Sequence, residues 1–148
     1  MHMKMKKIVF FISALMIMVS CGEKGGKQPE LTLEQKLCTE WHSTAMPLDG
    51  ADIYLSFGED NTFELYQKIV EGAYRLYRGT WSVEGNLLTG KYNDGEDWGA
   101  SYNVTVKDDS MTLTSNNEAA QESTFDRCSI PEEVKDTPYV EVKGMPAL

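Results

Sequence analysis

The chain has 148 residues, of which 41% are hydrophobic, 10% aromatic and 25% charged, a composition that is typical of one globular domain and excludes a disordered chain. Its formal net charge is −9, and removal of the three lysines among residues 1–20 takes that charge to −12. A body this acidic is repelled by nucleic acid and by anionic lipid head groups, which excludes both as partners bound through charge.

Residues 1–20 have the pattern of a secretory signal peptide. The basic start, MHMKMKK, precedes a stretch of twelve residues from Ile8 to Val19 that is apolar except for Ser13. A helix of that length spans about 18 Å, which is too short for a bilayer core of about 30 Å. A basic start, a short apolar stretch and a small residue are typical of an export signal that is removed. The alternative, a core helix of a cytosolic domain, would have no polar face to orient it.

Ser20 and Cys21 stand where the apolar run ends. The junction resembles a bacterial lipobox, in which the cysteine becomes the first residue of the mature protein and carries the acyl chains. The resemblance implies a lipid anchor at Cys21, palmitate among its acyl chains, and membrane attachment. The alternative is a soluble secreted protein in which Cys21 is an ordinary residue.

Residues 21–30 then read as a lipidated flexible tether, because GEKGGKQPE offers no apolar surface to bury. Gly22 stands where an aspartate would resemble an inner-membrane retention signal. We therefore expect the bacterial cell envelope, at the outer membrane, as the location.

The folded part opens with a short helix. Thr32 and Gln35 have the spacing of a capping box, and Leu33 and Leu37 lie one helical turn apart. This pattern predicts a helix over residues 33–39 that runs into a first strand near Trp41.

Seven further short apolar runs follow the Trp41 segment, and tight turns separate them: ADIYLSF, TFELYQKI, AYRLYRGTWSV, LLTGKY, WGASYNVTV, MTLTS and STFDRCS. The clearest alternation begins at Trp98 and places Tyr102 and Val104 on the same face. The connections are too short for parallel crossovers, so the sheet is antiparallel. If the first and last strands of this sheet pair, the sheet has no exposed edges, which favours an all-β, eight-stranded up-and-down barrel. A two-sheet sandwich is the alternative.

Residues 131–148 hold three prolines and few apolar side chains, and we interpret them as a C-terminal tail. The tail either lies along the barrel wall through Tyr139, Val140 and Val142 or remains mobile.

Residues 31–130 resemble the lipocalin-like domain of small lipoproteins from Bacteroidetes-type bacteria. The motifs that carry the resemblance are LCTEW, YLSFGEDNTFELY, YRGTWSVEGNLLTGKY and TFDRC. The resemblance implies a barrel that binds a small apolar ligand. It also implies that Arg127 packs over Trp41 to close one end of the barrel, where an arginine plane stacks well on an indole.

Cys38 and Cys128 remain once Cys21 is acylated. An even pair in an exported protein predicts a disulfide between the helix and the last strand. The alternative is two buried free thiols that act as small apolar side chains.

Enzyme chemistry finds little support, and we expect no catalytic activity. His42 is the one histidine outside the signal segment, and no GxSxG motif accompanies it. The sequence also has no cluster of metal ligands at the spacing a metal site needs, and nothing in it indicates a cofactor.

Binding remains, and two hypotheses follow. In the first, inward aromatic and apolar side chains contact a small apolar ligand; the candidates are Phe57, Phe63, Trp81, Tyr102 and Met111. In the second, these residues fill the barrel and an envelope protein binds outside, where Tyr66, Tyr74 and Tyr77 are candidates for an exposed aromatic patch. A cavity inside the barrel would favour the first hypothesis.

Overall fold

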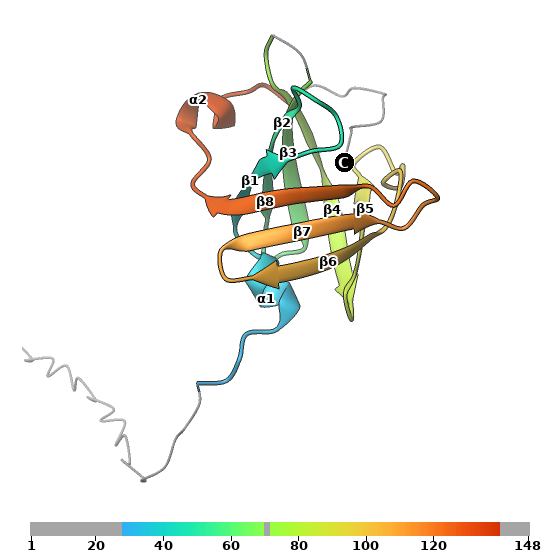
Figure 1. Cartoon of the computed structure of the whole chain (residues 1–148). Coiled ribbons are helices and arrows are strands. Elements are labelled where there is room, and N and C mark those ends of the chain that lie inside the picture. The colour runs from blue at the N-terminus through green and yellow to red at the C-terminus, as the bar shows by residue number, and fades with distance from the viewer. Residues whose placement is uncertain (1–27, 70–71, 140–148) are drawn as a thin grey trace, which may run out of the picture. The chain divides into compact units, whose positions relative to one another are not determined.

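A computed structural model describes residues 28–69 and 72–139. The predicted signal peptide, Cys21, and Val140 and Val142 of the tail lie outside these residues. The described chain forms eight strands and two short helices, in the order α1 Leu33–Leu37, β1 Glu40–Ala45, β2 Asp52–Phe57, β3 Thr62–Lys68, β4 Arg75–Glu84, β5 Leu87–Tyr92, β6 Tyr102–Lys107, β7 Ser110–Ser115, β8 Glu122–Cys128 and α2 Glu132–Lys135 (Figure 1). No helix within these residues is long and apolar enough to cross a membrane.

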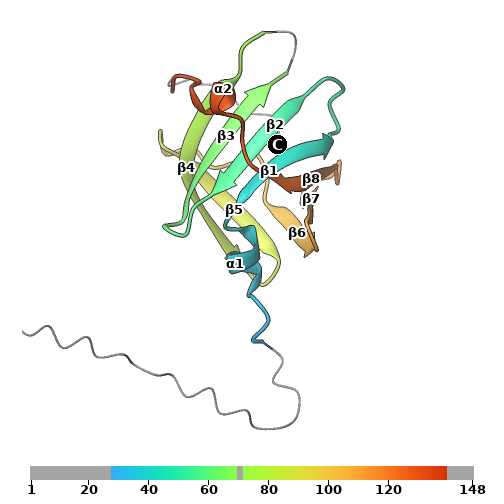
Figure 2. The same ribbon diagram turned by 90° about the vertical axis from the view of Figure 1, so that its left-hand side faces the viewer.

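The strands close into one antiparallel barrel, which confirms the predicted up-and-down topology and excludes the sandwich. Each strand pairs with its neighbour in sequence, and β8 pairs with β1 to complete the ring (Figure 2). All eight strands lie within the compact unit Leu31–Leu148. Because this unit holds its own apolar core, it can fold without the residues before it.

Helix α1 marks one end of the barrel, which we call the closed end (Figure 2). Its capping box is the predicted one: Gln35 N donates to Thr32 Oγ1 at 3.2 Å, and Thr32 N donates to Gln35 Oε1 at 3.0 Å. Leu37, on the last turn, is fully buried and accepts a hydrogen bond from Trp41 Nε1 at 3.1 Å. The opposite end of the barrel is called the mouth.

The barrel encloses a set of buried residues that we call the interior cluster. Their inward positions follow the period of two along each strand, as the burial pattern of β7 shows at Met111 and Leu113. The members are Leu37, Trp41, Ile53, Leu55, Phe57, Phe63, Leu65, Tyr77, Trp81, Leu88, Trp98, Tyr102, Val104, Met111, Leu113 and Phe125.

The segment after β8 covers part of the outer wall. Ile130 and Val134 of this segment are buried against Tyr66 and Leu76, and these four residues form the outer cluster. Glu40 fixes the segment, since Oε2 accepts from Ile130 N at 2.8 Å and Oε1 lies 2.9 Å from Lys135 Nζ. The first part of the predicted tail therefore packs on the barrel.

The predicted strand that begins at Trp98 is shorter in the structure. β6 begins at Tyr102, and Trp98 lies in the connection between β5 and β6. Only Leu87 and Leu88 of β5 pair with β6, so the connection occupies the space beside the rest of β5. Trp98 still faces inward, but a loop places it there.

Candidate functional site

Trp41 and Arg127 meet at the closed end. They are register partners on β1 and β8, and Arg127 Cζ lies 5.1 Å from the centre of the Trp41 ring. Arg127 Nε also donates to Asp109 Oδ1 at 3.0 Å. The guanidinium thus covers a fully buried indole and contributes to closing this end of the barrel.

The five residues predicted to contact a ligand are all buried inside the barrel, but they do not form one site. Phe57 and Trp81 pack edge to face at 5.0 Å beside the turn between β2 and β3, and Trp81 Nε1 donates to Gly58 O in that turn at 3.3 Å. Met111, at 0% exposure, follows the β6–β7 turn at the same end. These three residues belong to the packing of the closed end.

Phe63, the register partner of Phe57, and Tyr102 instead take part in an aromatic group around Trp98. The Trp98 ring lies 5.1 Å from Phe63 and 6.2 Å from Tyr102, both in edge-to-face arrangements. Tyr92 lies 5.8 Å from Phe63 and 6.1 Å from Tyr77. Tyr92 is half-buried, whereas the other four rings are buried. We call these five residues the mouth cluster.

Gly90 makes room for Trp98. Trp98 N donates to Gly90 O at 2.9 Å, and Tyr92 N donates to Glu96 O at 2.7 Å, so the loop folds back along β5. A Cβ at position 90 would lie 2.2 Å from Trp98 Cε2. Sequence reasoning missed this contact, although an isolated glycine within a strand is a signal for close approach.

Three buried polar side chains accompany the mouth cluster: Gln67, Ser115 and Ser123, at 4%, 5% and 4% exposure. They lie at the mouth ends of β3, β7 and β8, at positions that alternate with inward apolar residues. Among the residues that the structure describes, no charged side chain is buried. The interior is therefore neutral, with its polar groups toward the mouth.

Burial raises the pKa of two phenols of the mouth cluster, those of Tyr92 and Tyr102. Desolvation raises the pKa of Tyr102 to about 12, from an ordinary value of 10.0. Desolvation also raises the pKa of Tyr92, and the neighbouring phenols of Tyr102 and Tyr77 add to the effect. Near neutral pH these side chains are uncharged groups that can donate a hydrogen bond.

The predicted outer aromatic patch is wrong. Tyr77 faces the interior at 8% exposure, and Tyr66 is covered by the segment that contains α2 at 2% exposure. Tyr74 is partly buried, its hydroxyl donates to Asp52 Oδ2, and Lys68 Nζ lies 5.0 Å from its ring centre. Tyr66 belongs to the outer cluster and Tyr74 packs against it, whereas Tyr77 lies on the inward face, so the three form no exposed patch.

His42 lies on the outer face of β1. Its Nε2 is 2.6 Å from Asp52 Oδ1, and its ring stacks on Tyr54 at 4.2 Å. Burial favours a higher pKa for Asp52, but hydrogen bonds with Tyr74 and His42 outweigh that effect and hold the pKa below 3.8. The side chain thus belongs to a surface network, and within the described residues no group of three His, Cys, Asp or Glu could hold a metal ion.

The predicted disulfide is not formed, because Cys38 and Cys128 are free thiols in the structure. Cys38 packs against the interior cluster at the closed end, whereas Cys128 packs against the outer cluster. Burial raises the pKa of both thiols. Their side chains therefore belong to different layers of the barrel wall.

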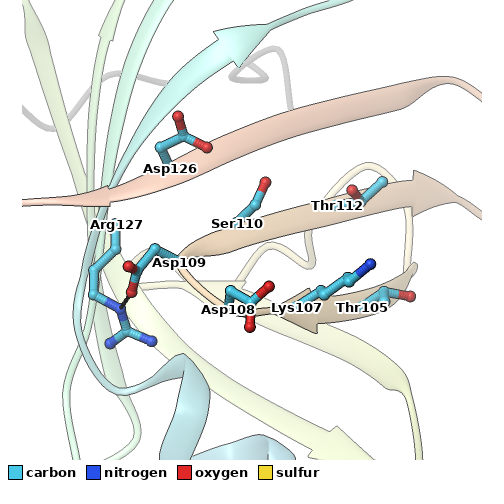
Figure 3. Close-up of a pocket in the computed structure, with 8 residues that line it drawn as sticks. All are labelled: Thr105, Lys107, Asp108, Asp109, Ser110, Thr112, Asp126 and Arg127. Atoms are coloured by element: carbon cyan, nitrogen blue, oxygen red, sulfur yellow. Dashed lines mark hydrogen bonds and ion pairs between the residues drawn. The ribbon is translucent and has the colours of Figure 1, made fainter.

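An open groove of about 720 Å³ lies outside the barrel, over β6, β7, β8 and the β6–β7 turn (Figure 3). Arg127 in this groove is already paired with Asp109, as the dashed line in Figure 3 marks. The lining is polar throughout and does not suit an apolar ligand; it consists of Thr105, Lys107, Asp108, Asp109, Ser110, Thr112, Asp126 and Arg127.

The chain was also compared with known proteins. A family described as a lipocalin-like domain matches residues 25–113, a range that runs from before α1 to Leu113 in β7. No curated protein matches the sequence. The match covers more than half of the chain and agrees with the closed eight-stranded barrel, so this chain belongs to the lipocalin-like domain family.

Proposed function

We propose that this protein is an exported lipoprotein whose barrel binds a small, largely apolar ligand in the mouth half of its interior. The observation that carries the proposal is the mouth cluster, in which five aromatic rings contact one another inside a barrel that also holds three buried polar side chains. Ligand sites are mostly apolar concave surfaces with a few polar groups that orient the ligand. The lipocalin-like fold supports the same function, since it is a binding fold.

The exposure of Tyr92 favours the mouth as the place where a ligand enters the barrel. At the closed end Leu37, Trp41 and Met111 are all at 0% exposure, and α1 packs against them. Toward the mouth Tyr92 retains an exposed surface, and Tyr77 is 8% exposed. A ligand that enters by the mouth meets the partly exposed ring of Tyr92 first.

The proposed activity is binding without catalysis. The phenols of Tyr92 and Tyr102 are protonated near neutral pH, and burial raises their pKa values further. Neutral phenols, amides and hydroxyls orient a ligand through hydrogen bonds but are poor general bases. The one histidine of the described residues lies outside the barrel beside Asp52.

Binding can be tested with N-phenyl-1-naphthylamine, an apolar dye that fluoresces when it leaves water. We expect residues 22–148 to bind one dye per chain with a saturable rise in fluorescence. Ser123→Leu adds volume inside the mouth and should weaken binding, whereas Thr124→Leu changes the adjacent, outward position and should not. Equal dye affinity for both variants, each checked for folding by circular dichroism, would contradict an interior site.

The anchor at Cys21 is supported by the lipobox-like junction and by the tether that follows it. Two or more acyl chains hold a protein stably on a membrane, where one would not. We expect wild-type protein expressed in its own host to incorporate an alkyne-labelled fatty acid and to sediment with outer-membrane vesicles. Cys21→Ser should do neither; label in that variant would place the acyl chain elsewhere.

A further inference from the structure

The three tryptophans of the chain differ in what their indole N–H groups contact. Trp41 Nε1 donates to Leu37 O at 3.1 Å, and Trp81 Nε1 donates to Gly58 O at 3.3 Å. Trp98 Nε1 has no acceptor among the residues that the structure describes. The Nε1 atom has less than 1 Å² of exposed surface, and Trp98 as a whole residue is 6% exposed.

A buried donor without an acceptor is rare, because it loses its hydrogen bond to water and gains none in return. The chain could have avoided the loss with an apolar ring at position 98. Instead the sequence keeps Gly90, whose missing side chain gives the indole its place in the barrel. The donor is thus held at a fixed position beside Phe63 and Tyr102.

Charge limits what could accept this hydrogen bond. No lysine or arginine is buried among the described residues, and the chain as a whole carries a net charge of −9. A carboxylate or phosphate inside the barrel would lie in a neutral, desolvated space without a counter-ion, which is costly. An uncharged acceptor, such as a carbonyl oxygen, has a much smaller desolvation cost when it enters the barrel.

The rings around Trp98 favour a flat ligand. Phe63 meets Trp98 with its plane at 78°, and Tyr102 does so at 68°. An aromatic ligand can make edge-to-face or offset-stacked contacts with these rings. A flexible alkyl chain cannot make such contacts. Tyr92, the half-buried member of the mouth cluster, contacts the same Phe63 ring and is the member of the cluster that is exposed to solvent.

We propose that the ligand of the barrel is an uncharged aromatic compound with a hydrogen-bond acceptor, and that Trp98 Nε1 donates to that acceptor. The inference rests on the proposed function and narrows it: fatty acids and other anionic lipids are excluded as ligands. Trp98 then sets the specificity, while the aromatic faces supply the general affinity for apolar molecules.

Two probes of matched shape test the inference, 2-acetylnaphthalene and 2-ethylnaphthalene, since only the first carries a carbonyl. We expect residues 22–148 to bind 2-acetylnaphthalene about tenfold more tightly by isothermal titration calorimetry, the size of one good hydrogen bond. Trp98→Phe keeps a ring but removes the N–H, and should reduce the difference between the two probes to less than twofold.

The three indole N–H signals in a ¹H–¹⁵N spectrum provide a readout that does not depend on any variant. On addition of 2-acetylnaphthalene the Trp98 signal should move downfield, while the signals of Trp41 and Trp81, which already have acceptors, serve as internal controls. Through-bond experiments assign the signals even if Trp98→Phe fails to fold.

The outcomes separate the inference from the function it rests on. Equal affinity for both probes with an unmoved Trp98 signal would overturn the inference and leave a binding barrel. Tighter binding of 2-naphthoate than of 2-acetylnaphthalene would overturn the uncharged class. If neither naphthalene binds and N-phenyl-1-naphthylamine does not bind either, the proposed ligand-binding function is contradicted.

Discussion

The closed end and the mouth cluster of this barrel each contain a buried tryptophan, and the two differ in what their indole N–H groups contact. At the closed end Trp41 lies under Arg127, and its N–H donates to α1. Toward the mouth Trp98 is almost as buried, yet its N–H has no acceptor within the described residues. Burial alone therefore does not distinguish a structural aromatic residue from a candidate ligand contact. The two are distinguished by whether the indole N–H has a hydrogen-bond acceptor within the protein.

Trp41→Ala should have the largest effect, because it removes a fully buried indole, its stacking on Arg127 and its hydrogen bond to Leu37. We expect a loss of about 3–5 kcal/mol in the free energy of unfolding, measured with urea. Tyr92→Ala at the mouth removes a half-buried ring and should cost less than half as much. Equal losses would contradict the distinction between the two ends.

Alkaline pH should destabilise the folded barrel, and Tyr102 should account for part of the loss. The unfolded chain ionises its tyrosines near pH 10, whereas burial raises the pKa of Tyr102 to about 12 in the folded protein. The folded state holds the proton longer, so stability is full below pH 10 and falls as pH rises toward 12. The share of Tyr102 in this fall is about 2–3 kcal/mol.

Urea unfolding at intervals between pH 9 and pH 12 measures this share. Tyr102→Phe has no proton to lose and should show a shallower fall than the wild type. Parallel curves for the two proteins would mean that Tyr102 ionises as freely in the barrel as in water.

Gly90→Ala tests how Trp98 is held. The added Cβ would lie 2.2 Å from Cε2 of the indole, so the ring must move, and we expect a loss of about 1–3 kcal/mol. In a Trp98→Ala background the same change should cost little, because the two side chains no longer meet. A double-mutant cycle in urea measures the coupling, and additive effects would contradict the contact.

Thr32→Ala should have the smallest effect of the series. It removes the side-chain acceptor of the capping box of α1, which is exposed, and should cost about 1 kcal/mol in the free energy of unfolding. Thr32→Ser keeps the acceptor and serves as the control. A loss of equal size in both variants would show that the threonine methyl group, not the cap, stabilises α1.

Much of the fold could be predicted from the sequence because the signals were local. Alternation within each strand and the tight turns predict eight strands in order, and Thr32 with Gln35 predicts the start of α1. Closure of the barrel follows from the number of strands and the need to remove edges. These inferences use residues that are close in the chain.

The sequence-based predictions were wrong where segments that are distant in the chain contact each other. An alternation that begins at Trp98 looks the same in a strand as in a loop that folds back onto Gly90. The outward Tyr66 reads as exposed until Ile130 and Val134, more than sixty residues later, cover it. The orphaned Trp98 Nε1 depends on every acceptor that could have reached it, so no short pattern in the sequence reveals it.

The central claim, that the barrel carries a small molecule, is tested most directly by native mass spectrometry of the lipidated protein that begins at Cys21, purified from the envelope of the source organism. We predict a discrete additional mass of a few hundred daltons that is released on denaturation and belongs to an uncharged aromatic compound. A bare protein mass, together with failure of the naphthalene probes to bind, would contradict the claim.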